Sequence, residues 1–146
     1  MVTRKLGFSA LLAAFYLRLT THDLTKDKYD FYNYVKGKVS MPYHVIKVRI
    51  GKESDDYTTR DTEAEELTPQ IDSWVDETSG KGDKPCADMQ NDIVQAITSA
   101  PLEVEGYHTP AHVSLDYANI LDDDTEPERA VKHGVTRFRV EMAPSS

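Results

Sequence analysis

Residue types that bind phosphate or act as nucleophiles gather between Ser79 and Cys86. The segment SGKGDK suggests a phosphate-binding loop, but it lacks the G-x-x-x-x-G-K-[ST] spacing that wraps backbone amides around a phosphate. Cys86 stands in the first turn of a predicted helix, where the helix dipole lowers a thiol pKa, but a cysteine nucleophile also needs a histidine beside it in space. We therefore interpret 79–84 as a flexible surface loop and Cys86 as a small buried or half-buried residue.

Two further groups have the composition of metal sites. His108 and His112 are four residues apart, as ligands on one helix face are, but Pro110 lies between them in a segment of loop and strand character. The run LDDDTEPE begins like a calcium loop. Its sixth position is then Pro127, where the turn needs glycine, and its twelfth is His133, where a bidentate glutamate belongs. The motifs GxGxxG and GxSxG are absent from the sequence. We expect no catalytic, cofactor-binding or metal-binding residues, and no cofactor.

The composition indicates one globular domain spanning residues 1–146. Apolar residues make up 39% of the chain and charged residues 29%. The 17 lysines and arginines against 25 aspartates and glutamates give a net charge of −8, which argues against a general nucleic-acid binder and against docking on anionic lipid. The single cysteine excludes an intrachain disulfide and fits assembly in a reducing cytosol.

A first helix is predicted over Arg4–Thr20. Its apolar residues recur at helical spacing and share one face: Phe8, Leu11, Leu12, Phe15 and Leu19. The apolar run Leu6–Leu17 is too short to span a bilayer. A signal peptide is the alternative, but Arg18 stands where cleavage needs small residues. We therefore expect a core helix and no membrane contact.

A second helix is predicted to begin at Pro85 and to stop before Pro101. Its apolar face is formed by Met89, Ile93, Ala96 and Ile97. Alternation of apolar and polar residues predicts strands at Tyr29–Lys36, Tyr43–Gly51, Leu67–Asp76, Leu102–Gly106, His112–Tyr117 and Val131–Met142. Pro69 cannot donate to a strand ladder, so it marks an edge or a bulge.

Two acidic segments, Lys52–Glu65 and Leu121–Glu128, separate the predicted strands, and residues 143–146 form a short tail. The order of elements is helix, strands, helix, strands. This order predicts an α+β fold in which an antiparallel sheet has two helices packed on one face. The segment 52–65 is expected to form a long acidic loop or hairpin arm, and a loop of this length in a small domain is often an interaction element.

With the elements in this order, the chain resembles the tail-completion proteins of long-tailed phages, also called tail-terminator or tail-to-head joining proteins. The resemblance covers about 6–142 and rests on loose packing patterns. These are the first helix LGFSALLAAFYLRL, the Pro-Tyr-opened strand MPYHVIKV, the central strand LTPQIDSWVDE, the helix CADMQNDIVQAI followed by PLEVEG, and the last strand HGVTRFRVEM. The acidic segment 52–65 and the run Asp122–Asp124 have no counterpart among these patterns.

The resemblance implies a structural virion protein and not an enzyme. Such proteins assemble in the host cytoplasm as a homohexameric ring at the head-proximal end of the tail. The ring terminates the tail tube and joins it to the head connector, so its partners are the tube protein and a head-completion or connector protein. DNA passes through the lumen without specific binding. The alternatives are another ring of the neck or tube, a small enzyme using acidic and histidine side chains, and a binding module using 52–65 as an arm.

A ring requires two different, complementary patches on each subunit. We hypothesise that acidic loops of one subunit face basic strand surfaces of the next, although the same charges could instead be solvated. The residues assigned to this interface are Lys47, Arg49, Arg137 and Arg139 on the basic side, with Asp55, Asp56, Asp61, Asp122, Asp123 and Asp124 on the acidic side. Surplus acid lining the lumen would repel phosphate and let DNA slide.

Overall fold

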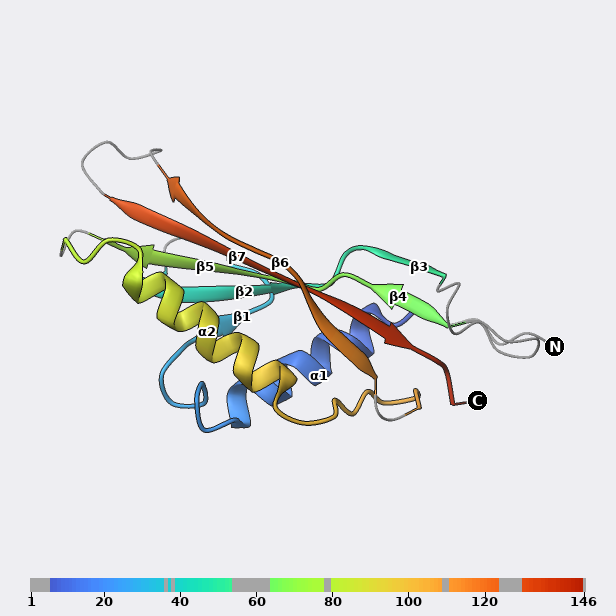
Figure 1. Ribbon diagram of the computed structural model, residues 1–146. Helices are drawn as coiled ribbons and strands as arrows, with labels where there is room; N and C mark the ends of the chain where they lie inside the picture. The colour runs from blue at the N-terminus through green and yellow to red at the C-terminus, as the bar shows by residue number, and fades with distance from the viewer. Residues whose placement is uncertain are drawn as a thin grey trace.

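The chain folds as a twisted sheet that has both helices on one side (Figure 1). A computed structural model describes residues 6–35, 37, 39–53, 64–77, 80–108, 111–123 and 130–145. Within them the elements are α1 (Phe8–Thr21), β1 (Phe31–Tyr32), β2 (Tyr43–Lys47), β3 (Gly51–Glu53), β4 (Glu65–Leu67), β5 (Gln70–Asp76), α2 (Lys84–Thr98), β6 (His112–Asp123) and β7 (Val131–Met142). The predicted α+β class is confirmed.

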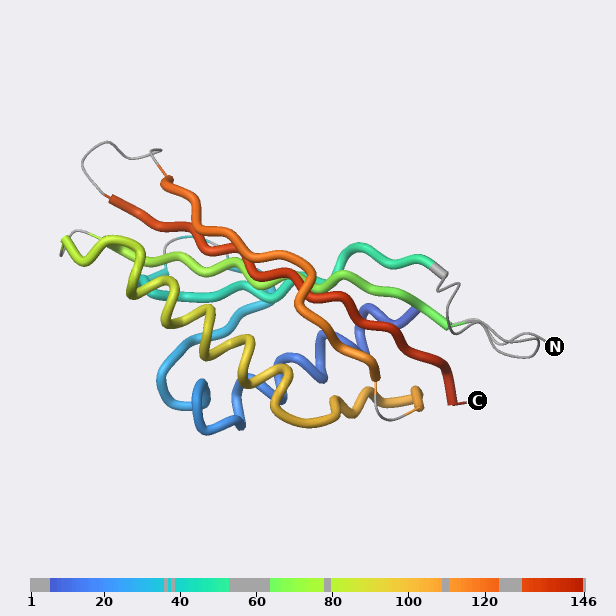
Figure 2. The backbone as a smooth tube through the Cα atoms, in the orientation of Figure 1, coloured from blue at the N-terminus to red at the C-terminus, as the bar shows by residue number. Residues whose placement is uncertain are grey.

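Strand β7 organises the sheet because it pairs with three other strands. Residues 131–137 pair antiparallel with β5, and residues 140–142 pair antiparallel with β4 on the same edge. Strand β6 runs beside almost the whole of β7, so it occupies the opposite edge (Figure 2). Beyond β5 lie β2, which is antiparallel to it, and β1, which is parallel to β2. The sheet is therefore mixed and mostly antiparallel, where the sequence predicted an antiparallel one, and β1 and β6 lie at opposite edges.

Pro69 lies between β4 and β5, which together form one interrupted strand. Its carbonyl oxygen accepts a hydrogen bond from the Phe138 amide at 2.8 Å, so the contact with β7 continues across the break. A proline has no N–H to give to a ladder, which explains why the strand is interrupted here. The predicted alternation is confirmed on both sides of the break, because Leu67, Ile71 and Val75 are buried beneath the helices.

Helix α1 packs into the core through the stripe that its sequence predicted. Leu11, Phe15 and Leu19 are fully buried, and the Phe15 ring meets the ring of Phe138 edge-on at 5.5 Å between centroids. Burial of each such side chain stabilises the fold by roughly 1.5–3 kcal/mol. No helix in the described part of the chain is long and apolar enough to cross a membrane.

Helix α2 lies beside α1 and covers the other half of the same sheet face (Figure 1). Ile93, Ala96 and Ile97 are fully buried as predicted, whereas Met89 is only half-buried. Arg18 of α1 reaches the end of α2, where its guanidinium donates hydrogen bonds to the carbonyl oxygens of Ala96, Ile97, Ala100 and Pro101 at 2.9–3.2 Å. Carbonyls in the last turn of a helix have no partner within the helix, so this arginine caps α2.

Four predicted strands have wrong boundaries. The predicted strand Tyr43–Gly51 ends at Lys47 as β2, and Gly51 begins β3. The ends of the predicted acidic segment 52–65 belong to β3 and β4, and residues 54–63 lie outside the described residues.

In the predicted strand Tyr29–Lys36, only Phe31–Tyr32 is a strand within the described residues. The segment Leu102–Gly106 is not a strand: Leu102 makes one isolated bridge to Ala111, and Gly106, with φ of +84°, turns the chain. Leu102 and Val104 are nevertheless both buried, which explains the alternation of their sequence.

The fourth boundary concerns β6, which extends to Asp123 and so takes in the start of the predicted acidic loop. The extension follows from its partner, because Asp123 pairs with Val131 at the start of β7. The expected alternation of Val113, Leu115 and Tyr117 is also interrupted. A register shift between Leu115 and Tyr117 places these two side chains on opposite faces of the sheet.

Candidate subunit interfaces

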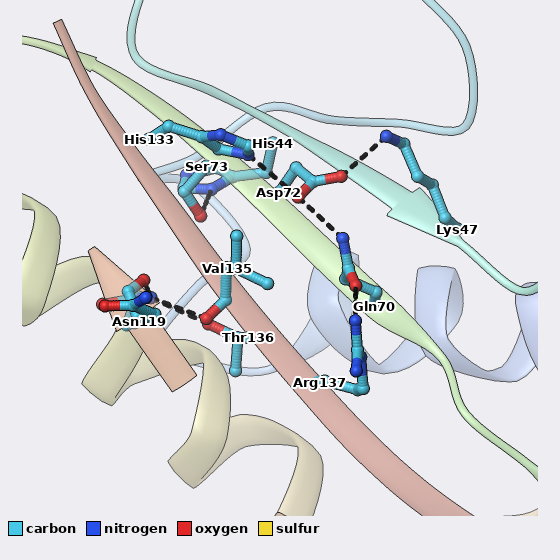
Figure 3. Close-up of polar contacts among 11 residues, drawn as sticks. His44, Lys47, Gln70, Asp72, Ser73, Asn119, His133, Val135, Thr136 and Arg137 are labelled. Atoms are coloured by element: carbon cyan, nitrogen blue, oxygen red, sulfur yellow. Dashed lines mark hydrogen bonds and ion pairs between the residues drawn. The ribbon is translucent and has the colours of Figure 1, made fainter. Parts of the chain in front are cut away.

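The face of the sheet that has no helix carries a cluster of polar side chains centred on Asp72 of β5. Its carboxylate receives Lys47 of β2 at 2.8 Å, His133 of β7 at 3.0 Å and the Gln70 amide at 3.0 Å (Figure 3). The Asp72 side chain is 2% exposed. Burial alone would raise its pKa, but hydrogen bonds from His133 and Lys47 outweigh this effect and lower the pKa to about 2. Asp72 is therefore an ionised group that joins three adjacent strands.

His133 is held from two sides. Its ring nitrogen contacts Asp72, and its ring stacks on the indole of Trp74 with centroids 3.8 Å apart and planes 10° apart. The Trp74 ring in turn lies near the ring of Tyr43, 6.4 Å between centroids. Trp74 is thus engaged by side chains of its own sheet, on the face opposite the helices.

Arg137 of β7 lies next to this cluster. Its guanidinium donates two hydrogen bonds to the Gln70 side-chain oxygen, at 2.9 and 3.2 Å, and lies 5.6 Å from the ring centre of Tyr117 on β6. The second contact is within the range of a cation–π interaction. Arg137 therefore connects β5, β7 and β6 across the open face.

Arg139 forms a separate group two residues further along β7. It donates to Glu66 of β4 at 2.6 Å and to Glu141 at 2.5 Å. Glu66 also receives Lys52 of β3 at 3.2 Å. Desolvation raises the pKa of Glu66, but the two cations outweigh it and lower the pKa overall. Arg139 is 42% exposed, so a part of its guanidinium is open to solvent.

The four predicted interface cations thus differ in their surroundings. Lys47, Arg137 and Arg139 each have an acidic or amide partner within their own chain. Arg49, just after β2, is exposed, and within the described residues no acidic side chain pairs with it. A basic surface assembled from all four residues is therefore already largely neutralised, and Arg49 is the member whose charge has no partner in the part of the chain that the structure describes.

The predicted acidic residues lie only partly within the described chain. Asp122 forms an ion pair with Lys132 of β7, and Lys132 also contacts Asp83 at the start of α2, at 3.1 Å. Asp123 is the last residue of β6. Asp55, Asp56, Asp61 and Asp124 lie outside the described residues. The proposed contact between acidic loops and basic strands therefore stays a prediction for these positions.

Large apolar side chains that the described residues leave exposed fall into two sets. The first set is on edge strand β6 and consists of Leu115, Tyr117 and Leu121. The second set is spread over the segment before α1, α1 itself and the segments that follow β1 and β2, and consists of Leu6, Tyr16, Leu17, Tyr34 and Ile50. Exposed apolar patches of this kind mark binding surfaces more often than isolated residues do.

A groove runs through the second set, between α1 and the β1 edge of the sheet. It consists of two adjoining hollows of about 490 and 350 Å³, which share the side chains of Ser9, Leu12 and Asn33. Tyr16 lines the first hollow, and Arg49 lines the second. The groove is therefore apolar along α1 and positively charged at the end nearest β3.

A third hollow of about 650 Å³ lies at the end of α2 and includes His108, His112 and Glu141 in its lining. The Glu141 carboxylate accepts a hydrogen bond from the Arg139 guanidinium. Among the described residues, no group of three histidine, cysteine or acidic side chains is arranged to hold a metal ion. Cys86 is fully buried, as its sequence position predicted, and burial raises its thiol pKa to about 11, which makes it a poor nucleophile.

Sequence reasoning missed Gln90, which is buried between α2 and the sheet. Its amide group donates to the backbone oxygens of Asn119 and Val135 at 3.1 and 3.2 Å, and to the Thr136 hydroxyl at 3.2 Å. The signal was present, because Gln90 is three residues before Ile93 and so shares the buried helix face. A polar side chain on a buried helix face needs hydrogen-bond partners, and this amide has them inside the fold.

Comparison with known proteins gives a fold relationship. The sequence matches no family model and no curated protein. Among solved structures, a chain of the virion of a native gene transfer agent (GTA) particle is similar over 96% of this chain and 99% of that chain. The TM-score is 0.73 and the sequence identity is 13%. At this identity, the likeness establishes a shared fold.

Proposed function

We propose that this protein is a structural component of a phage-like virion, and that it forms the ring that terminates the tail tube and joins it to the head connector. The observation that supports this proposal most is the fold shared, end to end, with a chain of the virion of a gene transfer agent particle. The same order of helices and strands underlies the resemblance to tail-completion proteins. A non-enzymatic role fits the engagement of the polar residues on the open face, which hold one another rather than line a pocket.

In this proposal, the partners are further copies of the chain in a homohexamer, the tube protein on one rim and a head-completion or connector protein on the other. The location is the head-proximal end of the tail. DNA passes through the lumen without specific binding, which accords with the net charge of −8. The charged side chains on the open face also have partners already, so few of them remain to hold phosphate.

The test is deletion of the gene in a cell that produces the particles, followed by electron microscopy of the lysate. A tail terminator leaves filled heads without tails and tubes of irregular, often excessive length. A head-closure protein leaves tails of normal length beside heads that have lost their DNA, and a tube protein leaves no tubes at all. Either of these two outcomes would overturn the tail-terminator assignment while keeping a virion role.

Purified protein provides a second readout. We expect mass measurement and negative-stain images to show closed rings with a central hole, either alone or after addition of short tubes. Wild-type protein supplied in trans must restore joined particles, which controls for effects of the deletion on neighbouring genes. A monomer that never enters particles would exclude every structural role proposed here.

A further inference from the structure

Exposed apolar side chains lie at two opposite edges of one sheet: those of β6 at one edge, and Tyr16 and Tyr34 beside the groove at the other. Strand β6 forms one edge because β4 and β5 occupy the other side of β7, and β1 and the free part of β2 form the opposite edge. A contact between two different edges of identical subunits is heterologous, and such a contact generates rings when its rotation closes. The sheet therefore presents two candidate halves of one contact.

The β6 edge has a defined centre. Leu115 and Tyr117 are 47% and 45% exposed, and the register shift between them turns them to opposite faces of the strand. Asp116 lies at this shift and is exposed, and no cationic side chain of the described chain pairs with it. A bulge interrupts the row of backbone groups that would let a second sheet pair continuously. Contact here is therefore made by side chains: two apolar ones flanking one carboxylate.

The opposite edge of the sheet carries an apolar groove and a positive charge. Strand β1 pairs only with His44 and Val45 of β2, so the sheet edge beyond them is bounded by the groove along α1. Asn33 donates to the Ile46 carbonyl at 3.0 Å, which closes the backbone edge at that point. The groove then offers apolar walls, with exposed Tyr16 and Tyr34 at its sides, and the open cation Arg49 at one end.

We propose that the centre of β6 in one copy of the chain docks into the groove between α1 and the β1 edge of a second copy, with Asp116 beside Arg49 and with Leu115 and Tyr117 against the apolar walls. Two features favour a second copy as the occupant. The two open charges are opposite in sign, and the apolar sets lie on different edges, so every subunit supplies both halves. The inference rests on the proposed ring and specifies the surfaces that build it.

Cysteine cross-linking tests the contact directly. The variant with both Arg49→Cys and Asp116→Cys is treated with a short bismaleimide and run on a denaturing gel. Because the contact is heterologous, we expect a ladder of dimer, trimer and higher species up to the size of the ring. Each variant with only one of the two substitutions must remain at the monomer position, and so must the wild type, whose Cys86 is buried. A dimer formed by Asp116→Cys alone would indicate that β6 meets β6, which overturns the proposal.

Charge reversal supplies a second readout on the same pair. Arg49→Glu or Asp116→Arg alone is expected to lower the fraction of assembled protein at least tenfold, and the double reversal to restore most of it. Circular dichroism and urea unfolding establish that each variant folds. If wild-type protein forms rings, charge reversal leaves assembly unchanged and no cross-link forms between the two cysteines, this interface is wrong and the ring function stands. If wild type forms no ring, alone or in particles, the proposed function fails and the interface falls with it.

Discussion

Acidification should destabilise the fold through His44, which lies under the sheet on β2. Its side chain is fully buried, its ring stacks on Phe31 at 5.1 Å and meets Tyr29 edge-on at 5.3 Å, and one ring nitrogen contacts the Ser73 hydroxyl at 2.7 Å. The other ring nitrogen is buried without a hydrogen-bond partner among the described residues. No carboxylate of the described residues acts on the ring to stabilise an imidazolium, and burial lowers the pKa of His44 from 6.5 to about 4.

The sign of the effect follows from where the proton goes. Between pH 6.5 and about 4, the unfolded chain protonates this histidine and the folded chain does not, so the free energy of unfolding falls as the pH falls. The full loss across this window is roughly 3 kcal/mol, since one pKa unit corresponds to about 1.4 kcal/mol. Between about pH 7.5 and about pH 5, the expected loss is about 2 kcal/mol.

The assay is urea unfolding at these two pH values and at one fixed protein concentration. His44→Phe keeps an aromatic ring in the stack but cannot be protonated. We expect it to be less stable than wild type at about pH 7.5 by roughly 1–3 kcal/mol, because the Ser73 hydroxyl loses its partner. It should, however, lose about 2 kcal/mol less than wild type on acidification. His108→Gln changes an exposed histidine and should keep the full pH dependence. Equal pH dependence in wild type and His44→Phe would refute the reasoning.

Three further variants can be measured by the same urea unfolding. Gln90→Leu should lower the free energy of unfolding by roughly 1–3 kcal/mol, because it leaves buried acceptors unsatisfied. Exposed Gln95→Ala should change it by less than about 0.5 kcal/mol, and equal effects of the two variants would contradict the role of Gln90. Gly134→Ala should lower the free energy of unfolding by roughly 1–3 kcal/mol, since its new Cβ would lie 2.8 Å from the Cys86 sulfur. Adding Cys86→Ala should recover part of this loss, and additive losses in the double variant would argue against the clash. Asp72→Asn should lower the free energy of unfolding by roughly 1–3 kcal/mol near neutral pH. It should also remove the loss of stability that wild type shows as the pH falls from 3.8 to about 2. If the variant shows the same loss over this pH range as wild type, Asp72 is not the group that causes it.

The parts of the fold that the sequence predicted are those in which one short-range pattern decides the outcome. Alternation placed Leu67, Ile71 and Val75 on one face, and helical spacing placed Leu11, Phe15 and Leu19 on another. The missing donor of Pro69 likewise predicted an irregularity in the strand, an edge or a bulge, and the structure has an interruption between β4 and β5 there. Each of these depends on the residue and its immediate neighbours, so no knowledge of the tertiary fold was needed.

The parts that the sequence did not predict depend on partners far away in the chain. Asp72 lies on the strand face opposite the apolar residues, so its sequence position indicates an exposed acid. Its burial depends on Lys47 and His133 from two other strands. The extension of β6 to Asp123 likewise depends on the length of β7. The predicted interface residues stay a prediction, and sequence has the same limit there, because it locates a charge but does not reveal the partner that neutralises it.

Intrachain pairing limits which charged residues are able to join subunits in the proposed ring. A cation such as Lys47, paired to a buried carboxylate, can join a neighbouring subunit only by giving up that pair, and leaving Asp72 buried without its cation would cost more than a new surface contact returns. An open charge at a sheet edge has no such cost. In the proposed contact Arg49 and Asp116 are charges of this kind, whereas Lys47 and Asp72 join adjacent strands of one subunit. The proposed interface therefore uses residues other than those that pair across the open face, and it can form without breaking those pairs.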